Sequence, residues 1–351
     1  MVIVMQHGAT ATQVETVIDT VQKEGLTPFV NPGVERQVIA VLGLVDAQKA
    51  NLADKFEALD GVERVQLISE PYKLSSRNYH PDDTVVQVGD VRIGGAEVVV
   101  IAGPCSVETE EQVLETAHAV KAAGGKLLRG GAFKPRTSPY SFQGLGVDAL
   151  RILARAREET GLPIVTEILD PEDLDTVAQY TDIFQVGARN MSNFRLLQRL
   201  GNLRKPVLLK RGPSAKLREM LQAAEYIMIG GNHQVILCER GIITWDDACR
   251  NTTDINAIPV LKQWSHLPVI LDPSHSVGHT RWVTPIARAG VAAGADGLIV
   301  EVHPNPAQAL SDGGQALRPD QFTQMMDEVQ RIAWAVGREV PLPTRESVGA
   351  E

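Results

Sequence analysis

The stretch EVVVIAGPCSVETEEQ, from Glu97 to Gln112, begins the pattern that decides the fold. An apolar run stops at Gly103-Pro104, a cysteine follows at position 105, and a helix-like segment begins just beyond it. Short apolar runs and longer helical segments then alternate along the rest of the chain. The runs are VVVIA (98–102), KLLRG (126–130), PIVTE (163–167), IFQVG (183–187), PVLLK (206–210), QVILC (234–238), PVILD (268–272) and GLIVE (297–301).

Eight strands separated by helices predict an α/β fold, a closed (β/α)₈ TIM barrel over residues 97–338. A doubly wound sheet would usually have fewer strands and a glycine-rich first turn, which this sequence lacks. Residues 339–351 are assigned to a C-terminal tail.

A different order of elements precedes the barrel. Residues 1–70 alternate between strand and helix patterns in the order βαββαβ, which is typical of a small α+β ferredoxin-like domain. Residues 71–96 are a turn-rich linker followed by a β-hairpin at TVVQVGDVRIGG (84–95). In the first domain we expect strands at 1–6, 26–31, 35–44 and 62–69, and helices at 11–24 and 46–61, the second capped by Asp46.

The composition narrows the classes of function. The 351 residues are 44% hydrophobic and 22% charged, which is ordinary for a soluble protein. A net charge of −9 argues against nucleic acid as a partner, and the apolar runs are too short to span a membrane. No secretion signal is apparent at the start. Three cysteines, Cys105, Cys238 and Cys249, do not form a disulfide framework, so we expect a cytoplasmic protein.

Basic residues follow the predicted strands. Catalytic groups in barrels collect at the carboxyl ends of the strands, so these cations should share one rim. Cations gathered in an otherwise acidic protein imply bound anions, and guanidinium and ammonium groups suit phosphate and carboxylate. Any one of them alone could simply solubilise a loop. The set is Arg129, Lys134, Arg136, Arg189, Lys210, Arg211 and Arg240.

A second set of strand-end residues mixes sulfur, nitrogen and oxygen. Strands one, seven and eight are neighbours in a closed barrel, so Cys105, His275, Glu301 and the nearby Asp312 can converge. Such a set accepts one divalent ion: Mn, Fe, Co, Cu or Zn. Two alternatives are a cysteine that only packs and a nucleophilic cysteine with the histidine as its base. The second leaves both carboxylates without a role, so the metal site is favoured.

The motifs at these strand ends resemble one enzyme family. They are GPCSVE, LRGGAFKPRTSPYSFQGLG, GARNMSNF, LLKRG, ILCERG, DPSHSVG and VEVHP with ALSDG. The sequence resembles the 3-deoxy-D-arabino-heptulosonate 7-phosphate (DAHP) synthases over nearly its whole length, including the ferredoxin-like module of one branch. The resemblance implies condensation of phosphoenolpyruvate with erythrose 4-phosphate and water. That reaction is the first step of the shikimate pathway to aromatic amino acids, and it needs a divalent metal.

The resemblance also implies roles for individual residues, while Arg211 receives none. The implied metal ligands are Cys105, His275, Glu301 and Asp312, and the implied catalytic residues are Lys134, His275 and Glu167, with Glu167 beside the attacking water. The carboxylate and reacting carbons of phosphoenolpyruvate would meet Arg129, Lys134 and Lys210, and its phosphate Arg189, Arg240 and the Ala188 amide. Arg136 and Thr137 would bind the phosphate group of erythrose 4-phosphate. Lys134 and Pro135 would lie near its aldehyde end.

Two rival functions stay open. The 3-deoxy-D-manno-octulosonate 8-phosphate (KDO 8-phosphate) synthases, which use arabinose 5-phosphate, share the GPC, GARNM and EVHP segments. The loop Lys134-Pro135-Arg136-Thr137-Ser138 has the DAHP synthase form instead. A non-catalytic barrel that senses amino acids is the other rival, and the intact metal and cation sets argue against it.

The resemblance also bears on regulation and assembly. It implies an aromatic amino acid effector at residues 1–70 and a homotetramer. Phe29 and Asn31 stand where regulated relatives tend to have a His-x-Ser pair, which leaves open whether tyrosine, phenylalanine or neither binds. The alternative is a module that only mediates assembly.

Overall fold

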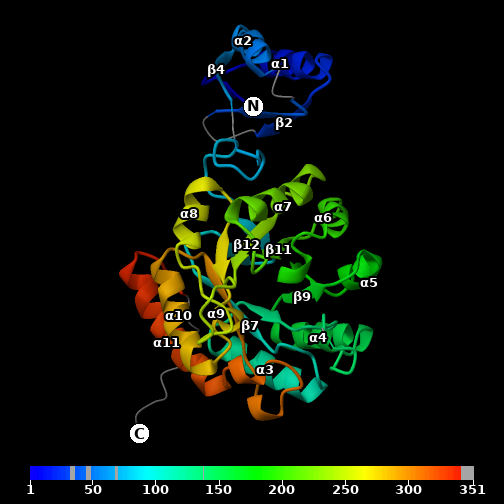
Figure 1. The fold of residues 1–351 in the computed structure, drawn as a ribbon, viewed down its shortest axis with the longest axis vertical. Helices are drawn as coiled ribbons and strands as arrows, with labels where there is room; N and C mark the ends of the chain where they lie inside the picture. Colours follow the sequence, from blue (N-terminus) through cyan, green and yellow to red (C-terminus); the bar gives the residue numbers. More distant parts are fainter. Residues whose placement is uncertain (32–35, 45–48, 68–69, 137, 341–351) are drawn as a thin grey trace. The chain divides into compact units, whose positions relative to one another are not determined.

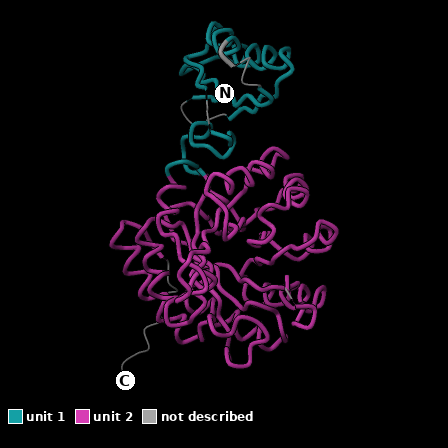
Figure 2. Tube along the Cα trace, viewed as in Figure 1, with its two compact units in different colours: residues 1–83, 263–266 teal, residues 84–262, 267–351 magenta. Residues whose placement is uncertain are grey.

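The structure is a computed structural model that describes residues 1–31, 36–44, 49–67, 70–136 and 138–340. The chain divides into two compact units, drawn in teal and magenta in Figure 2. Residues 1–83 with 263–266 form the first unit, and the remaining residues from 84 onward form the second.

The first unit contains the expected ferredoxin-like domain. Its sheet has the order β2-β3-β1-β4 with antiparallel neighbours. Helix α1 begins with a capping box between Thr10 and Gln13, and its residues Val14, Val17 and Val21 are buried at helical spacing. The helix that was predicted over 46–61 is described from Lys49, so its expected cap Asp46 lies outside the described residues. The elements are β1 (Val2–Met5), α1 (Ala11–Lys23), β2 (Thr27–Asn31), β3 (Val38–Leu42), α2 (Lys49–Glu57) and β4 (Val62–Gln66).

The second unit is the predicted eight-stranded barrel. All eight apolar runs form strands, every neighbouring pair is parallel, and pairing of the last strand with the first closes the barrel. The strands are β7 (Val99–Gly103), β8 (Leu127–Arg129), β9 (Ile164–Ile168), β10 (Ile183–Val186), β11 (Val207–Lys210), β12 (Val235–Glu239), β13 (Val269–Leu271) and β14 (Gly297–Glu301).

Helices surround these strands, as Figure 1 shows. Each strand is followed by one outer helix, and β13 is followed first by the short helix α9. The helices begin and end on ordinary signals: the Thr109 side chain caps α3, and Gly161 ends α4 in the left-handed conformation. They are α3 (Glu110–Ala122), α4 (Val147–Thr160), α5 (Leu174–Ala178), α6 (Phe194–Gly201), α7 (Leu217–Ile229), α8 (Ala257–Trp264), α9 (Pro273–Val277), α10 (Thr280–Ala292) and α11 (Pro319–Ala335).

The interior of the barrel is packed at the end where the strands begin. The predicted hairpin is present as β5 (Val86–Val88) and β6 (Val91–Ile93). Its buried valines and isoleucine form one core with the first residues of several strands, such as Val99, Leu127 and Ile183. The hairpin therefore closes that end, and the opposite, carboxyl end of the strands is left for chemistry.

Candidate active site

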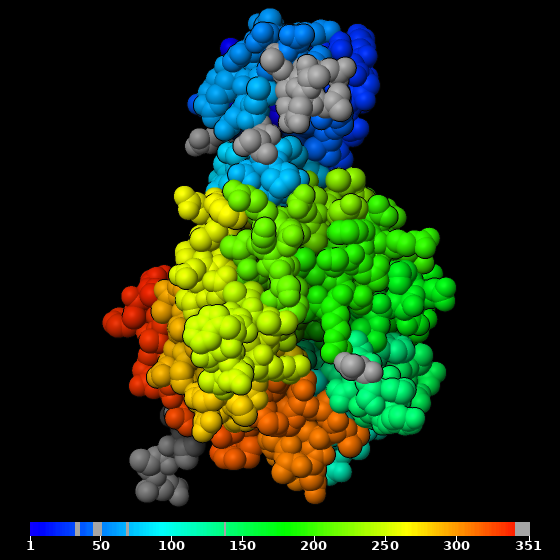
Figure 3. Space-filling model, viewed as in Figure 1, coloured from blue at the N-terminus to red at the C-terminus, as the bar shows by residue number. Residues whose placement is uncertain are grey.

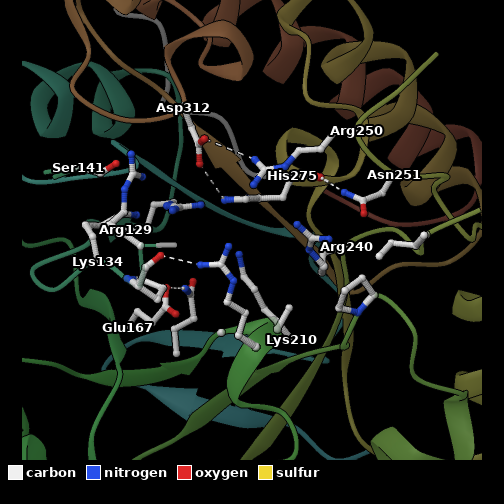
Figure 4. Close-up of a pocket in the computed structure, with 18 of the residues that line it drawn as sticks. Arg129, Lys134, Ser141, Glu167, Lys210, Arg240, Arg250, Asn251, His275 and Asp312 are labelled. Atoms are coloured by element: carbon white, nitrogen blue, oxygen red, sulfur yellow. Dashed lines mark hydrogen bonds and ion pairs between the residues drawn. The ribbon is translucent and has the colours of Figure 1, made fainter. Parts of the chain in front are cut away.

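A cavity of about 560 Å³ lies at the carboxyl ends of the strands. Figure 3 shows the barrel face hollowed near its middle, between green and yellow-to-orange segments, and Figure 4 shows the labelled side chains around this space. Pro135, Glu167 and Ala188 line the cavity together with two of the four expected metal ligands, His275 and Asp312. Its basic lining residues are Arg129, Lys134, Arg136, Arg189, Lys210, Arg240 and Arg250. Of the residues with expected roles, Thr137 lies outside the described part of the chain.

The four expected metal ligands converge beside this cavity. One ligand atom from each of Cys105, His275, Glu301 and Asp312 lies within 4.8 Å of all the others. The Cys105 Sγ is 3.5 Å from Asp312 Oδ2, and the His275 Nε2 is 3.2 Å from Glu301 Oε1 and 3.8 Å from Asp312 Oδ2. The closure of β14 onto β7 brings together groups that lie up to 207 residues apart in the sequence.

The backbone fixes each of the four positions. The amide of Gly131 donates to the Cys105 carbonyl at 3.1 Å, and Glu301 is the last residue of β14. His275 lies in α9. Asp312 has a φ of +51°, and it is the one non-glycine residue with positive φ in the described chain. A residue held in that sparsely populated conformation at a cluster of charges is typical of a functional site.

The electrostatics of the cluster fit a divalent cation. Burial raises the pKa of the Cys105 thiol to about 11, and the charge of Glu301 adds to this effect against the opposing charge of Lys134. Burial likewise lowers the pKa of His275, which keeps the imidazole neutral and able to coordinate. The Glu301 Oε1 atom is fully buried and accepts no hydrogen bond from the described residues. A thiol, a neutral imidazole and two carboxylates therefore form an acceptor set that one cation would complete.

Lys134 lies between the cluster and the cavity. Its Nζ is 3.0 Å from Cys105 Sγ and 3.1 Å from the Cys105 carbonyl oxygen. Burial alone would lower the pKa of Lys134, but the charges of Cys105 and Glu167 outweigh burial and raise it. The ammonium therefore keeps its proton at the edge of the cavity.

Arg129 is a buried guanidinium with hydrogen-bonding capacity to spare. Its Nη2 lies 3.3 Å from Glu301 Oε1, which links it to the Cys105-His275-Glu301-Asp312 cluster. Its Nε and Nη1 are buried without a hydrogen-bond partner among the described residues. Unsatisfied buried donors are costly, so these two groups favour an anionic ligand.

Arg211 differs from its neighbour Lys210. Lys210 lines the cavity, whereas Arg211 does not. The Nη1 of Arg211 donates to Glu239 Oε2 and to Asp254 Oδ2, both at 2.8 Å, and its Nε donates to the Ala215 carbonyl. Consecutive side chains at a strand end point in opposite directions, so one of the pair faces the cavity and the other fixes the loops outside it.

The sequence analysis does not identify five polar lining residues, one of which, Gln185, lies within β10. Ser138 and Ser141 belong to the long loop after β8, and Arg250 and Asn251 to the loop between β12 and α8. The Asn251 amide donates to the His275 carbonyl at 3.0 Å. The four loop residues lie too far past a strand end for strand-end logic to select them. Ser138 and Ser141 lie within the motif LRGGAFKPRTSPYSFQGLG, so the motif itself could have identified them.

The other cysteines are free thiols. Cys105, Cys238 and Cys249 form no disulfide. Cys238 is fully buried in the barrel core, as a packing cysteine would be. Among the described helices, none has both the length and the apolar character that a membrane crossing requires.

Comparison with known proteins shows which family the sequence matches. The DAHP synthetase I family matches residues 73–337, and the DAHP synthase ferredoxin-like domain matches residues 1–70. The phospho-2-dehydro-3-deoxyheptonate aldolase of Thermotoga maritima is 49% identical over 340 residues, which are 97% of this chain and 100% of that protein. The 2-dehydro-3-deoxyphosphooctonate aldolase of Nitratidesulfovibrio vulgaris is 35% identical over 255 residues, 68% of this chain and 92% of that one.

Solved structures agree with the sequence relatives. The crystal structure of the Thermotoga maritima aldolase, a DAHP synthase, has a TM-score of 0.77 at 48% identity, over 97% of this chain and 99% of that one. A truncated form of the Thermotoga maritima enzyme has a TM-score of 0.73 at 48% identity and covers 77% of this chain and 99% of its own.

Proposed function

The chain belongs to the DAHP synthetase I family, and from this premise we propose how its own residues carry out the family's reaction. The enzyme is a transferase that condenses phosphoenolpyruvate with erythrose 4-phosphate and water to give DAHP and phosphate, the first step of the shikimate pathway. One observation supports the proposal above the others: a cavity lined by seven basic side chains adjoins the Cys-His-Glu-Asp cluster. The basic lining suits two phosphorylated substrates, and the cluster suits an aldehyde-activating metal.

Phosphoenolpyruvate lies, in this proposal, over the carboxyl ends of β8 to β12. Arg129 and Lys210 bind its carboxylate, and the two spare N–H groups of Arg129 support that assignment. Arg189, Arg240 and the Ala188 amide bind its phosphate. Burial lowers the pKa of Arg240, but a guanidinium remains charged at neutral pH.

Erythrose 4-phosphate enters from the side of the β8 loop. Its phosphate is bound by Arg136 and Thr137, and its aldehyde lies near Lys134 and Pro135. The Arg189 Nη1 donates to the Pro135 carbonyl at 2.7 Å, which supports adjacent binding of the two substrates. Two polyanions held side by side react as if within one molecule, which removes much of the entropic barrier.

The family depends on a divalent metal, and we propose that Cys105, His275, Glu301 and Asp312 hold it. When bound, such an ion, one of Mn, Fe, Co, Cu or Zn, supplies Lewis-acid polarisation of the aldehyde oxygen. Lys134 then has a defined task. It holds a proton at Nζ and gives it to the aldehyde oxygen as the new C–C bond forms from C3 of phosphoenolpyruvate.

Water completes the reaction at C2 of phosphoenolpyruvate. Glu167 orients this water, and its own carboxylate is oriented by the Gln185 amide, which donates to Glu167 Oε2 at 3.2 Å. The water oxygen bonds to C2, and its proton leaves through the nearby carboxylate. The C2–O bond to phosphate then breaks while the new hydroxyl on C2 gives its proton to the departing phosphate, so that inorganic phosphate leaves and the keto group of DAHP remains.

Regulation, assembly and location are further parts of the proposal. We assign an aromatic amino acid effector to residues 1–70, which is supported by their match to the DAHP synthase ferredoxin-like domain. A homotetramer follows the family pattern, and a cytoplasmic location is in keeping with three free thiols. Rates measured with and without tyrosine or phenylalanine at about 1 mM, the top of the usual enzyme ligand range, test the effector. Unchanged rates with both would exclude regulation by these two.

A substrate comparison tests the proposed function. Metal-stripped protein is given phosphoenolpyruvate, Mn²⁺ and either erythrose 4-phosphate or arabinose 5-phosphate, and the loss of enol absorbance is followed. We expect phosphoenolpyruvate to be consumed with erythrose 4-phosphate but not with arabinose 5-phosphate. We expect no consumption when Mn²⁺ is left out. Consumption with arabinose 5-phosphate would favour the KDO 8-phosphate reaction. No consumption with either would favour a sensing barrel.

A further inference from the structure

Asp272 has no role in the reaction as described above, yet it contacts residues on both sides of the site. It is fully buried at the end of β13, where its Oδ1 accepts the His275 backbone amide at 2.9 Å. Its Oδ2 accepts from Lys210 Nζ at 2.5 Å. The same Oδ2 lies 2.8 Å from His275 Nδ1, without the alignment of a regular hydrogen bond.

The contact with Oδ2 decides which ring nitrogen of His275 carries the proton. A carboxylate oxygen only accepts, so a bare Nδ1 at this distance would place two lone pairs against each other. Nε2 also faces a carboxylate oxygen, Glu301 Oε1 at 3.2 Å, and the shorter 2.8 Å contact of Nδ1 favours Nδ1 as the site of the proton. The unprotonated Nε2 is left facing Glu301 Oε1 and Asp312 Oδ2, which is the orientation that a metal ligand needs.

Lys210 depends on the same oxygen. Its side chain is 5% exposed, and a buried ammonium requires a nearby negative charge. The Asp272 Oδ2 atom, 2.5 Å from Lys210 Nζ, is the group that supplies this charge. Asp272 is thus an ionised carboxylate shared by a cavity-lining cation and a member of the metal-ligand set.

We propose that Asp272 is a positioning residue that orients the Nε2 of His275 toward the metal and holds the Lys210 ammonium toward the substrate anion. The inference rests on the proposed function for the identity of that anion, phosphoenolpyruvate. Its part concerning His275 stands on the contacts alone. A single carboxylate with two such partners couples the metal site to the anion site, because loss of its charge affects both.

The plain alternative is that Asp272 only caps the short helix α9. Asp272→Asn separates the two roles. Asparagine is as good a helix cap as aspartate and can still accept the His275 amide through its carbonyl oxygen. Its neutral carboxamide then directs an NH₂ group at Lys210 and His275, so the contacts specific to the charged carboxylate are lost.

Asp296→Asn is the matched control. Asp296 is also a buried aspartate, 2% exposed, and Lys262 Nζ donates to both of its oxygens at 2.9 and 3.0 Å. It precedes β14 and lies outside the cavity and the metal-ligand set. Both variants lose a buried ion pair, so a general loss of stability should appear in both. An effect on the site should appear only in Asp272→Asn.

Metal affinity is the first measurement. The full-length, metal-stripped protein is titrated with Co²⁺, and the thiolate-to-cobalt absorption is followed together with the melting temperature. We expect Asp272→Asn to bind Co²⁺ about 10- to 100-fold more weakly, the range for loss of an outer partner of a metal-ligating histidine. We expect Asp296→Asn to match the parent within about twofold. Parent-like Co²⁺ affinity in folded Asp272→Asn would overturn the proposal.

Phosphoenolpyruvate affinity, measured by calorimetry without metal, is the second measurement. It should weaken at least about tenfold in Asp272→Asn, since a charge-assisted contact of Lys210 is lost. If Asp272→Asn does not fold, Lys210→Met is used in its place and its Co²⁺ affinity is measured. Removal of a neighbouring cation should tighten Co²⁺ binding at least threefold in that variant, and unchanged affinity would overturn the shared-carboxylate role. A parent protein that binds Co²⁺ but condenses no substrate would overturn only the proposed function.

Discussion

Gly187 lies so close to Glu167 that a Cβ atom added to it would sit 2.0 Å from Glu167 Oε1. The backbone of Gly187 is extended, with φ −65° and ψ 157°, so any residue could adopt its conformation. The position therefore favours glycine because of the space that the Glu167 carboxylate occupies.

Gly187→Ala should displace that carboxylate and lower the rate without unfolding the barrel. A shift of about 1 Å in a catalytic group can cost roughly 100-fold, and we expect a loss of kcat/KM of that order. The control is Gly95→Ala, whose Cβ would meet ordinary contacts at 3.7 Å. Parent-like activity in Gly187→Ala would show that Glu167 need not occupy its observed position.

Cys105→Ser should remove the sulfur ligand while it keeps the size of the side chain. We expect weaker binding of Mn²⁺ and loss of most metal-dependent activity, because a serine hydroxyl is a poor replacement for a thiolate. Cys249→Ser is the matched control, since that thiol is outside the four-residue cluster. Full activity of metal-stripped Cys105→Ser would contradict the metal mechanism.

Arg129→Lys should weaken phosphoenolpyruvate binding despite the retained charge. An ammonium cannot reproduce the fork of N–H groups, and its one amine would remain with Glu301. Loss of a charge-assisted hydrogen bond costs about 1.5–3 kcal/mol, or roughly 10- to 150-fold in affinity. Calorimetric titration with phosphoenolpyruvate measures this change, and an affinity within twofold of the parent would refute the assignment.

Arg211→Met should reduce stability rather than catalysis. It leaves the buried Glu239 and the half-buried Asp254 without their shared partner, and breaking such a pair costs about 3–5 kcal/mol. Denaturant unfolding measures the loss, and kcat/KM of the folded fraction should stay within a few-fold of the parent. Adding Glu239→Gln should restore part of the stability. A large loss of kcat/KM with parent-like stability would move Arg211 into the active site.

Cys238 should make the protein less stable at alkaline pH. Burial raises the pKa of its thiol, whereas an unfolded thiol titrates near about 8.5. Above that pH the unfolded chain loses a proton that the folded chain keeps. Stability therefore falls as pH rises, by up to about 1.4 kcal/mol per pH unit for this group. Unfolding measured between pH 8 and 10 should show a shallower slope in Cys238→Ala, and an identical slope would contradict this account.

The order of elements was predictable because hydrophobic periodicity is a local property. Each of the eight apolar runs is short and rich in aliphatic residues, and a helical segment separates each run from the next. Element ends were less certain. The second helix of the first domain is described as ending at Glu57, four residues before the expected Gly61.

The cavity lining was predictable only where it follows a strand directly. Lys134 and Lys210 lie within a few residues of strand ends, and closure of a parallel barrel brings such residues together. Arg250 lies more than ten residues beyond β12, and the path of its loop back to the cavity has no periodic signature. Its Nη1 donates to the Gln315 side chain at 3.0 Å, a contact between loops that no spacing rule reveals.

The sequence by itself determined the barrel, the ferredoxin-like domain and the chemical character of the strand ends, since these depend on patterns within single segments. Only the tertiary structure decided which way each side chain points and which charged groups pair with each other. It turned Lys210 toward the cavity and Arg211 away from it, and it gave Lys210 and His275 one carboxylate, Asp272, to share. The physical reason is that side-chain direction and ion pairing depend on atoms contributed by strands far apart in the sequence, which meet only when the barrel closes.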